Sequence, residues 1–201
     1  MDQIIDFSNV KFLTEEEIAA EKQKEVEQAR QERKQTMLKY VPPLYQTTDQ
    51  EQLPQKALKV VKEWGWTNKR EKANLLITGA TGTGKTRLAW IALQLRYVKN
   101  AWQPYSIGAD TFSRRLMAES NLMTEATRAH ILLLDDLGKE RQTPTAESAL
   151  NELVRARIDY CKPTIITTSY EKGELINRFN HKQVGEGIAR RILEDSVILH
   201  L

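Results

Sequence analysis

An apolar strand that runs into a glycine-rich loop and then into a helix is the feature that most limits how this chain can fold. The strand is predicted at 74–78 (NLLIT) and the loop at 79–86 (GATGTGKT), with a helix starting near Lys85. Glycines let the backbone curl until successive N–H groups point into one concavity, which binds phosphate oxygens. The start of the helix adds the positive end of its dipole. This strand–loop–helix order predicts an anion-binding loop.

The loop matches the pattern G-x-x-x-x-G-K-[ST], known as Walker A, and we call residues 79–86 the phosphate loop. Lys85 is expected to reach the β- and γ-phosphates of a bound ATP, and Thr86 to place its hydroxyl on Mg²⁺. The residues expected to bind the nucleotide are Gly79, Ala80, Thr81, Gly82, Thr83, Gly84, Lys85 and Thr86.

A second motif, 131–138 (ILLLDDLG), has four apolar residues that end in a carboxylate. This pattern predicts a buried parallel strand whose carboxyl end faces the active site. Asp135 is expected to hold Mg²⁺, through a water molecule. Asp136 is expected to act as a general base on the attacking water, for which it must lie within one hydrogen bond of that water. The alternative for Asp136 is a helix cap or a residue that lies beside the metal without acting on water.

The rest of the chain alternates between apolar runs and helical stretches. Strands are predicted at 105–107, 129–134, 164–167 and 197–201, besides the one at 74–78. Helices are predicted at 55–64, with Gly65 ending it, 85–99, 109–127 (with a break near Asn121), 145–161 and, in pieces, 171–195. Such alternation predicts an α/β domain with a five-stranded, mostly parallel sheet. A strand-and-helix unit at 104–128 separates the two motifs, which is typical of ATPases that couple hydrolysis to motion.

Residues 14–40 contain no glycine or proline and form a predicted charged helix. Thr14 and Glu17 make a capping box at its start, and its apolar positions are too sparse to bury much surface. Val41-Pro42-Pro43 breaks the helix. We therefore divide the chain into an arm, residues 1–40, and an ATPase domain, residues 41–201. The arm is either a partner-binding element or a solvated helix.

Composition excludes several other classes of protein. A single cysteine, Cys161, excludes an internal disulfide framework and a cysteine-cluster zinc site. The chain has no apolar run long enough to span a membrane and its start lacks the pattern of a signal peptide, so a cytoplasmic protein with no membrane partner is expected. The formal net charge is +3, divided into −2 on the arm and +5 on the ATPase domain. This excess of positive charge permits nucleic-acid binding without requiring it.

Other residues have weaker signals. Thr168 and Ser169, at the end of a predicted strand, are candidates for orienting the attacking water, or else cap the strand. Arg191 is a candidate for stabilising the charge on a γ-phosphate, commonly that of a neighbouring subunit. The basic residues that are candidates for DNA phosphate contacts are Arg114, Arg115, Lys139 and Arg141, and a solvated basic surface is the alternative. His130, His181 and His200 have no metal-ligand spacing and are expected to be structural.

Four segments together resemble the DnaC-type helicase loaders and the IstB-type transposition ATPases of the AAA+ superfamily. They are GATGTGKTRLA, ILLLDDLGKE, RARIDYCKPTIITTSY and GEGIARRILEDSVILHL. The resemblance covers about residues 40–201 and leaves the N-terminal helix outside it. It implies a three-layer P-loop NTPase fold of the AAA+ type, ATP and Mg²⁺ as cofactors, ATP-dependent self-association and binding of single-stranded DNA.

The resemblance also assigns roles by position. Thr168-Ser169-Tyr170 matches the sensor 1 segment, in which Ser169 stands where an asparagine is usual. Arg191 matches the arginine finger, and Arg157 matches an arginine that often faces the neighbouring subunit. The chain has no counterpart of the helical lid or its sensor 2 arginine, and its 109–128 region is short. Such compactness is consistent with a phage or mobile-element version.

These features predict a DNA replication ATPase that loads a replicative hexameric helicase onto single-stranded DNA and grips the helicase through the N-terminal helix. Its ATP hydrolysis is expected to be weak without DNA or partner. Two alternatives stay open. One is an IstB-type transposition helper ATPase, and the other is a non-hydrolysing, nucleotide-gated adaptor.

Overall fold

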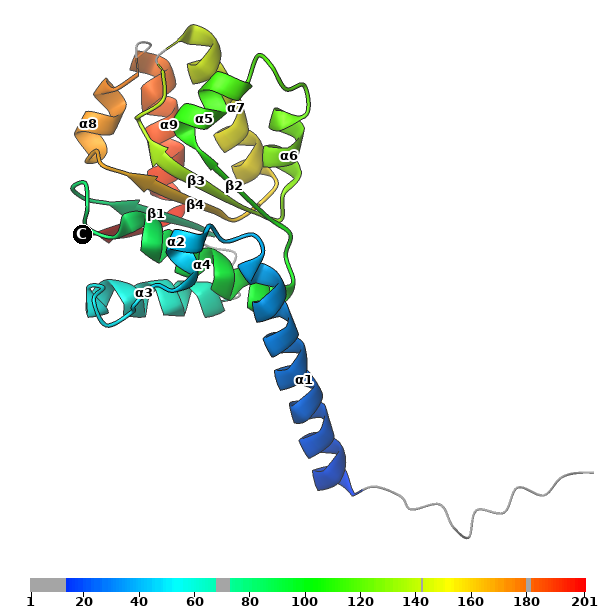
Figure 1. The fold of residues 1–201 in the computed structure, drawn as a ribbon. Coiled ribbons are helices and arrows are strands. Elements are labelled where there is room, and N and C mark those ends of the chain that lie inside the picture. Colours follow the sequence, from blue (N-terminus) through cyan, green and yellow to red (C-terminus); the bar gives the residue numbers. More distant parts are fainter. Residues whose placement is uncertain (1–13, 68–72, 142, 180–181) are drawn as a thin grey trace, which may run out of the picture.

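The computed structural model of the chain describes residues 14–67, 73–141, 143–179 and 182–201. Within them, five strands form one sheet between two layers of helices, as Figure 1 shows. The strands are β1 (Asn74–Thr78), β2 (Pro104–Gly108), β3 (Ile131–Leu137), β4 (Thr164–Thr168) and β5 (Ser196–His200). The helices are α1 (Glu15–Leu38), α2 (Pro43–Gln46), α3 (Gln55–Trp66), α4 (Lys85–Asn100), α5 (Ala109–Arg115), α6 (Leu122–Arg128), α7 (Pro144–Asp159), α8 (Lys172–Asn177) and α9 (Lys182–Glu194). The predicted fold class is confirmed.

The strand order of the sheet is β2-β3-β4-β1-β5, and each neighbouring pair is parallel. Strand β4 therefore lies between β1, which leads into the phosphate loop, and β3, which carries the two aspartates. Because parallel strands all end at the same edge of a sheet, the ends of β1, β4 and β3 meet there. The fold thus brings together segments that are far apart in the sequence.

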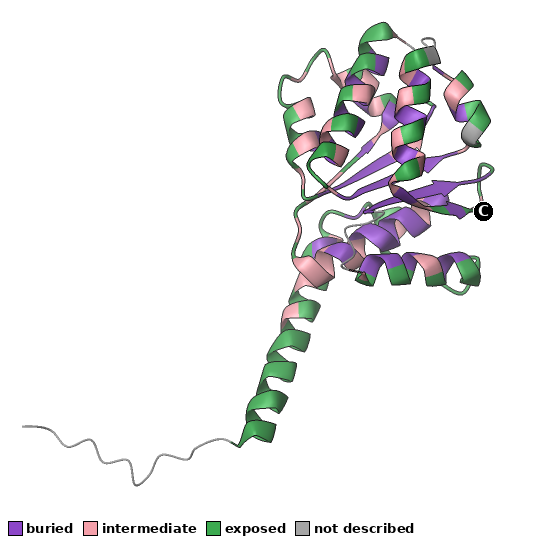
Figure 2. Ribbon diagram, turned by 180° about the vertical axis from the view of Figure 1, so that it is seen from behind, coloured by how far each residue is buried: buried purple, intermediate pink, exposed green. Residues whose placement is uncertain are grey.

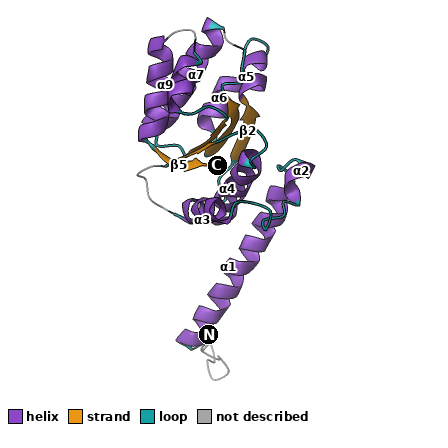
Figure 3. Cartoon of the chain, turned by 90° about the vertical axis from the view of Figure 1, so that its left-hand side faces the viewer, coloured by secondary structure: helices purple, strands orange, loops and turns teal. Residues whose placement is uncertain are grey.

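The two faces of the sheet are covered by different helices. Helices α3 and α4 lie against one face, and α5 to α9 lie against the other (Figures 1 and 3). Neighbouring residues of one strand enter different cores: Leu75 and Ile77 pack with α3 and α4, whereas Leu76 packs with α7 and α9. All five residues of β1 are buried, as are all five of β4. Burial on both faces explains why apolar and polar residues do not alternate in the centres of these strands, Leu75–Ile77 and Ile165–Ile166.

Helix α1 projects from the globular part of the chain (Figures 1 and 2). The predicted capping box is present at its start, where the Glu17 N–H donates to Thr14 Oγ1 and the Thr14 N–H donates to Glu17 Oε2. Residues 14–28 are all exposed. Near its other end Met37 is buried, and Arg33 donates to the carbonyls of Val98 and Lys99, 3.2 Å away in each case. The helix is thus attached to the last turn of α4 by its C-terminal third.

The prediction that Gly65 ends a helix is wrong, because α3 continues through Gly65 to Trp66. A Cβ atom at this position would lie 2.8 Å from the Cβ of Leu95 on α4. The glycine therefore allows α3 and α4 to pack closely instead of marking the end of α3. This role depends on a contact between helices that are distant in sequence.

Two further findings concern helices, and the first agrees with the predicted break. The predicted helix over 109–127 is two helices, α5 and α6, separated by a turn that includes the predicted break at Asn121. The short helix α2 starts at Pro43, a position that proline favours because its missing N–H has no partner there in any case.

Among the described residues, no helix is both long enough and apolar enough to cross a bilayer.

Candidate nucleotide-binding site

The phosphate loop connects β1 to α4 at the carboxyl edge of the sheet. Gly79 has φ 142° and Gly84 has φ 94°, a region of backbone conformation that favours glycine. A Cβ at Gly79 would lie 2.4 Å from the carbonyl oxygen of Leu201, so this position also has no space for a side chain. Gly84 then caps the start of α4. The loop therefore has the backbone that its sequence predicts, ending at a helix N-terminus.

Lys85, the first residue of α4, folds back over the loop. Its Nζ donates hydrogen bonds to the carbonyl oxygens of Gly79, at 2.8 Å, and Ala80, at 2.7 Å. The residue is only 6% exposed, and burial lowers the pKa of its ammonium group. The cation is therefore placed at the concavity of the loop, where a phosphate would partner it better than neutral carbonyls do.

Thr86 and Asp135 meet across the gap between the two motifs. Thr86 Oγ1 donates to Asp135 Oδ1 at 3.1 Å and lies 3.2 Å from Oδ2. On the other side, Thr167 Oγ1 donates to Asp135 Oδ1 at 2.5 Å. Burial raises the pKa of the Asp135 carboxyl, and the hydrogen bonds from Thr167 and Thr86 oppose that rise. Asp135 is thus a partly buried carboxylate stabilised by hydroxyl groups.

This donor set fits a magnesium ion. Mg²⁺ favours oxygen ligands and is usually held by one or two carboxylates together with substrate phosphates and waters. Thr86 Oγ1 and Asp135 supply two such oxygens beside the phosphate loop, and a cation would relieve the burial of the carboxylate. The described residues contain no group of three or more His, Cys, Asp or Glu side chains that could hold a metal without a nucleotide.

Asp136 points differently from its neighbour. Its φ is 57°, a strained conformation that aspartate tolerates better than most residues, and its N–H donates to Thr167 Oγ1 at 2.8 Å. The pairing of β3 with β4 shifts register between Leu134 and Leu137, so both aspartates lie on an irregular stretch. The side chain of Asp136 is 36% exposed and pairs with Lys139 Nζ, 2.9 Å from its Oδ2. One carboxylate is therefore held by hydroxyl groups, while the other pairs with a lysine.

The two polar residues at the end of β4 have different environments. Thr168 Oγ1 donates to the Leu137 carbonyl at 2.7 Å and accepts the Tyr170 N–H, so it contacts backbone and not the aspartates. The Ser169 hydroxyl is buried, and among the described residues it has no hydrogen-bond partner. Thr167, which the sequence did not single out, is the residue of β4 that contacts both aspartates. Its only sequence signal is that it is one of three threonines in β4.

Arg191 lies far from the phosphate loop of its own chain. Ser196, which begins β5, is paired with Asn74 at the first residue of β1, so the end of α9 lies at the opposite edge of the sheet from the loop. The five residues of β1 alone span about 16 Å at roughly 3.3 Å per residue. Arg191 Nη1 donates to Asn151 Oδ1 at 3.1 Å. Any contact of this arginine with a γ-phosphate therefore requires a second copy of the chain.

Arg157 does not face a neighbouring subunit, in contrast to what the resemblance implies. Its side chain is 1% exposed and lies inside the chain. It donates to Thr164 Oγ1 and to several backbone carbonyls, among them those of Ala126, Ala129 and Pro163. Burial lowers the pKa of its guanidinium to about 10. Arg157 is a structural residue that links α7 to the starts of β3 and β4.

The candidate DNA contacts are partly engaged within the chain. Arg114 pairs with Asp110 at 3.0 Å, and Arg115 forms two hydrogen bonds with Glu119, at 2.5 and 2.6 Å. Arg141 is exposed.

The histidines are structural where the chain is described. His130 and His200 take part in hydrogen bonds with neighbouring strands or loops, whereas His181 lies outside the described residues.

An aromatic segment lies beside the phosphate loop. Tyr45 stacks on Trp90 of α4, with ring centroids 6.0 Å apart, and Arg87 Nη1 donates to the Leu44 carbonyl. Burial raises the pKa of the Tyr45 hydroxyl, and the nearby carboxylate of Asp135 adds to that rise. Tyr45 thus lies within electrostatic range of the site.

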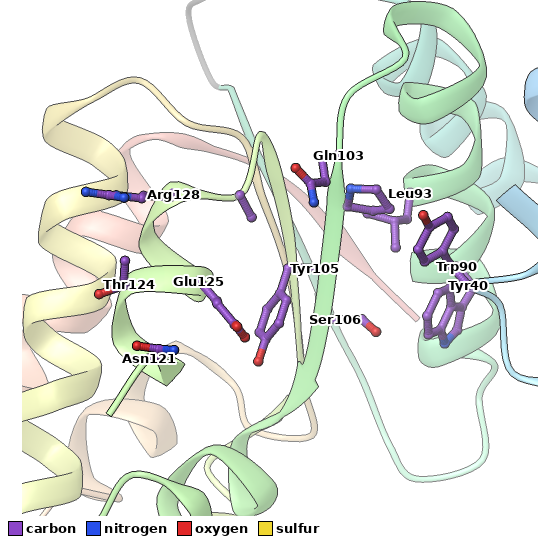
Figure 4. Close-up of a pocket in the computed structure, with 12 residues that line it drawn as sticks. Tyr40, Trp90, Leu93, Gln103, Tyr105, Ser106, Asn121, Thr124, Glu125 and Arg128 are labelled. Atoms are coloured by element: carbon purple, nitrogen blue, oxygen red, sulfur yellow. The ribbon is translucent and has the colours of Figure 1, made fainter. Parts of the chain in front are cut away.

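A cavity of about 740 Å³ lies at the free edge of β2 (Figure 4). Tyr40 and Trp90 line it on one side, and Tyr105, Glu125 and Arg128 line it on the other. None of the sequence-predicted site residues lines this cavity. The cavity is therefore separate from the sequence-predicted site.

Solved structures with the same fold are helicase loaders and replication initiators. The crystal structure of the DnaC helicase loader matches with 26% identity and a TM-score of 0.64, covering 82% of this chain and 95% of that one. The crystal structure of DnaI matches with 17% identity and a TM-score of 0.68, over 80% and 94% of the two chains. DnaA from Aquifex aeolicus bound to AMPPCP matches with 19% identity and a TM-score of 0.63, over 81% and 51%. The last two show the fold alone.

A comparison with curated protein sequences gave no match. The profile of the family described as IstB-like ATP binding protein matches residues 3–201. The match includes the N-terminal helix, so the sequence-based limit of the resemblance at about residue 40 was too narrow. With the phosphate loop and Asp135 at the edge of an AAA+ fold, this chain belongs to the IstB-like ATP binding protein family.

Proposed function

We propose that this chain is an ATPase that loads a replicative hexameric helicase onto single-stranded DNA. The observation that carries the ATPase part is the arrangement in which Thr86, Asp135 and Thr167 meet beside Lys85. A phosphate loop alone would bind an anion, whereas this arrangement adds oxygen ligands for a divalent cation and a second, more exposed carboxylate. Such a set suits phosphoryl transfer to water.

Each residue has a defined task in the proposed reaction. The N–H groups of the phosphate loop and the Lys85 ammonium bind the β- and γ-phosphates. Thr86 and Asp135 hold Mg²⁺, which neutralises charge on the phosphates when bound. Asp136 orients the attacking water and accepts its proton, a contribution of about 10²–10⁴-fold in rate for a positioned base. The buried hydroxyl of Ser169 is the second candidate for contacting that water.

The site is completed, in this proposal, by a second copy of the chain. Arg191 cannot reach the phosphate loop of its own chain, so it would serve the site of a neighbour in an ATP-dependent assembly. An arginine supplied in this way stabilises charge in the transition state. ATP would therefore bind between subunits and favour their association.

The arm, residues 1–40, is proposed to bind the helicase, while residues 41–201 form the ATPase domain. Residues 14–28 are exposed along the projecting part of α1, which leaves them available to a partner. Arg33 and Met37, in contrast, attach α1 to the domain. The exposed part of the arm is thus proposed to bind the partner, and the part with Arg33 and Met37 attaches the arm to the ATPase domain.

The test is a truncation that removes residues 1–28 and keeps Arg33 and Met37. We expect the truncated protein to lose capture of the purified hexameric helicase while its ATP affinity and melting temperature stay those of the full chain. Capture of the helicase at full strength by the truncated protein would contradict the assignment of the arm. The full chain should also speed the appearance of helicase on circular single-stranded DNA, and no such increase would contradict loading.

Two other functions have specific support. The family match is to IstB-like proteins, which favours a transposition helper; capture of a transposase but not of a helicase by the full chain would establish it. The pairing of Asp136 with Lys139, together with a serine at position 169, favours an adaptor that binds ATP without hydrolysing it. ATP binding without turnover in the presence of DNA and the helicase would establish the adaptor.

A further inference from the structure

We propose that Thr167 is the positioning residue that holds Asp135 and Asp136 in their two different roles, an inference that rests on the nucleotide site proposed above. Thr167 lies on β4 and is fully buried. Its hydroxyl donates to Asp135 Oδ1 at 2.5 Å and accepts the N–H of Asp136 at 2.8 Å. A hydroxyl has one proton to donate and two lone pairs, so it can make both bonds at once.

The irregular stretch of β3 creates the need for this residue. The regular pairing of β3 with β4 is interrupted between Leu134 and Leu137, and Asp136 has φ 57°. Because a buried N–H without a partner is costly, the amide of Asp136 needs an acceptor that the neighbouring strand backbone does not supply there. The Thr167 hydroxyl is that acceptor. It therefore supports a strained backbone that turns the Asp136 side chain away from Asp135.

The same hydroxyl also orients the partly buried carboxylate of Asp135. Asp135 receives one hydrogen bond from Thr86 and a shorter one from Thr167. A Thr86 hydroxyl that serves a bound cation does so through an oxygen lone pair and still has its proton to donate, so Thr86 and Thr167 together fix the orientation of the carboxylate. Partners of this kind, which orient a metal ligand, typically change metal affinity or activity by about 10–100-fold when they are mutated.

The neighbouring residue provides a matched control. Thr168 is also buried on β4, and its hydroxyl donates to the Leu137 carbonyl at 2.7 Å, with no contact to either aspartate. Replacing either threonine by valine removes one buried hydroxyl and keeps the shape of the side chain. The two variants should therefore lose similar thermal stability, and they should differ only in effects that pass through the aspartates.

The experiment measures the affinity of the full chain for a fluorescent N-methylanthraniloyl derivative of ATP, once with Mg²⁺ and once with EDTA. In Thr167→Val we expect the gain in affinity due to Mg²⁺ to fall about tenfold, whereas Thr168→Val keeps the gain of the wild type. Thr167→Ser, which restores the hydroxyl, should recover the gain. Affinity in EDTA should be the same in all four proteins, since the phosphate loop is unchanged.

Equal gains from Mg²⁺ in Thr167→Val and Thr168→Val would overturn the proposal and leave Thr167 as an ordinary buried hydroxyl. If Thr167→Val does not fold, Thr167→Ala and Thr168→Ala make the same comparison, and equal gains from Mg²⁺ in these two variants would overturn the proposal equally. A wild-type chain that binds the derivative in neither condition would overturn the nucleotide site itself, and the proposal with it. The two failures are distinguishable, because the first leaves nucleotide binding by the wild type intact and the second does not.

Discussion

Thr86 Oγ1 donates a hydrogen bond to Asp135 Oδ1 at 3.1 Å, although the two residues are 49 positions apart in the sequence. Thr86 belongs to the first turn of α4 and Asp135 to the end of β3. The contact joins the two motifs at one edge of a parallel sheet, with β4 between their strands. Nucleotide binding and cation binding are therefore properties of one site, and the predictions below separate that site from the rest of the chain.

Arg157 is predicted to stabilise the fold and not the reaction. Arg157→Ala would leave several buried carbonyls without a donor and open a cavity, which should lower the free energy of unfolding by more than about 3 kcal/mol. Arg155, two residues earlier on α7, is 67% exposed and pairs with Asp159, so Arg155→Ala should cost less than about 1 kcal/mol. Urea unfolding measures both values. Similar losses in the two variants would contradict the buried role of Arg157.

Met37 is predicted to anchor α1. The side chain is 1% exposed in the core formed with α3 and α4, so Met37→Ala should lower the free energy of unfolding by about 2–5 kcal/mol. Val26 lies on the same helix and is 50% exposed. Val26→Ala should change that free energy by no more than about 0.5 kcal/mol. Chemical unfolding of the full chain tests both, and a harmless Met37→Ala would show that α1 is not packed as described.

Glu140 is predicted to make stability depend on pH. The residue is 2% exposed, burial raises the pKa of its carboxyl, and its Oε2 accepts the Gly138 N–H. Because the folded chain holds this proton more tightly than the unfolded chain, the contribution of Glu140 to stability is complete below its ordinary pKa. That contribution is lost as the pH rises through the raised value.

Glu140→Gln resembles the protonated form at every pH. Its free energy of unfolding should therefore exceed that of the wild type at pH 8, and the difference should shrink toward zero near pH 4. Exposed Glu152 gives the control, since the difference between Glu152→Gln and the wild type should stay nearly constant over the same range. A difference for Glu140→Gln that grows as the pH falls would have the wrong sign for a raised pKa.

Arg191 is predicted to act on the site of a neighbouring copy. Arg191→Ala and Lys85→Ala should each be inactive alone, the first for lack of the arginine and the second for lack of the phosphate contact. In a mixture, the intact phosphate loop of one variant can meet the intact arginine of the other. Phosphate release should therefore recover to a measurable fraction of the wild-type rate. A mixture as inactive as its components would argue against a shared site.

The sequence predicted what depends on local pattern. The phosphate loop, the five strands and the capping box at Thr14 each rest on residues close together in the chain, and the structure has them where the pattern places them. Gly65 was misjudged because its role depends on Leu95 of another helix. Arg157 was misjudged because three of its acceptors, the carbonyls of Ala126, Thr127 and Ala129, belong to a segment that only the fold brings to it.

Thr167 illustrates the same limit within the site. Three threonines occur in β4, and no local pattern separates the one that contacts both aspartates from Thr168, which contacts backbone. The difference follows from the alternation of side chains along β4 and from the irregular pairing with β3. The side-chain alternation and the irregular pairing matter only once β3 lies beside β4, and a single sequence does not specify which strand is the neighbour of β4.

Whether the site hydrolyses ATP is tested by phosphate release from the full chain with Mg²⁺, single-stranded DNA and the helicase present. We expect steady turnover by the wild type and a fall of at least about 100-fold in Asp136→Asn, with the melting temperature unchanged. Turnover that is absent from the wild type, or equal in wild type and Asp136→Asn, would contradict the proposed hydrolysis.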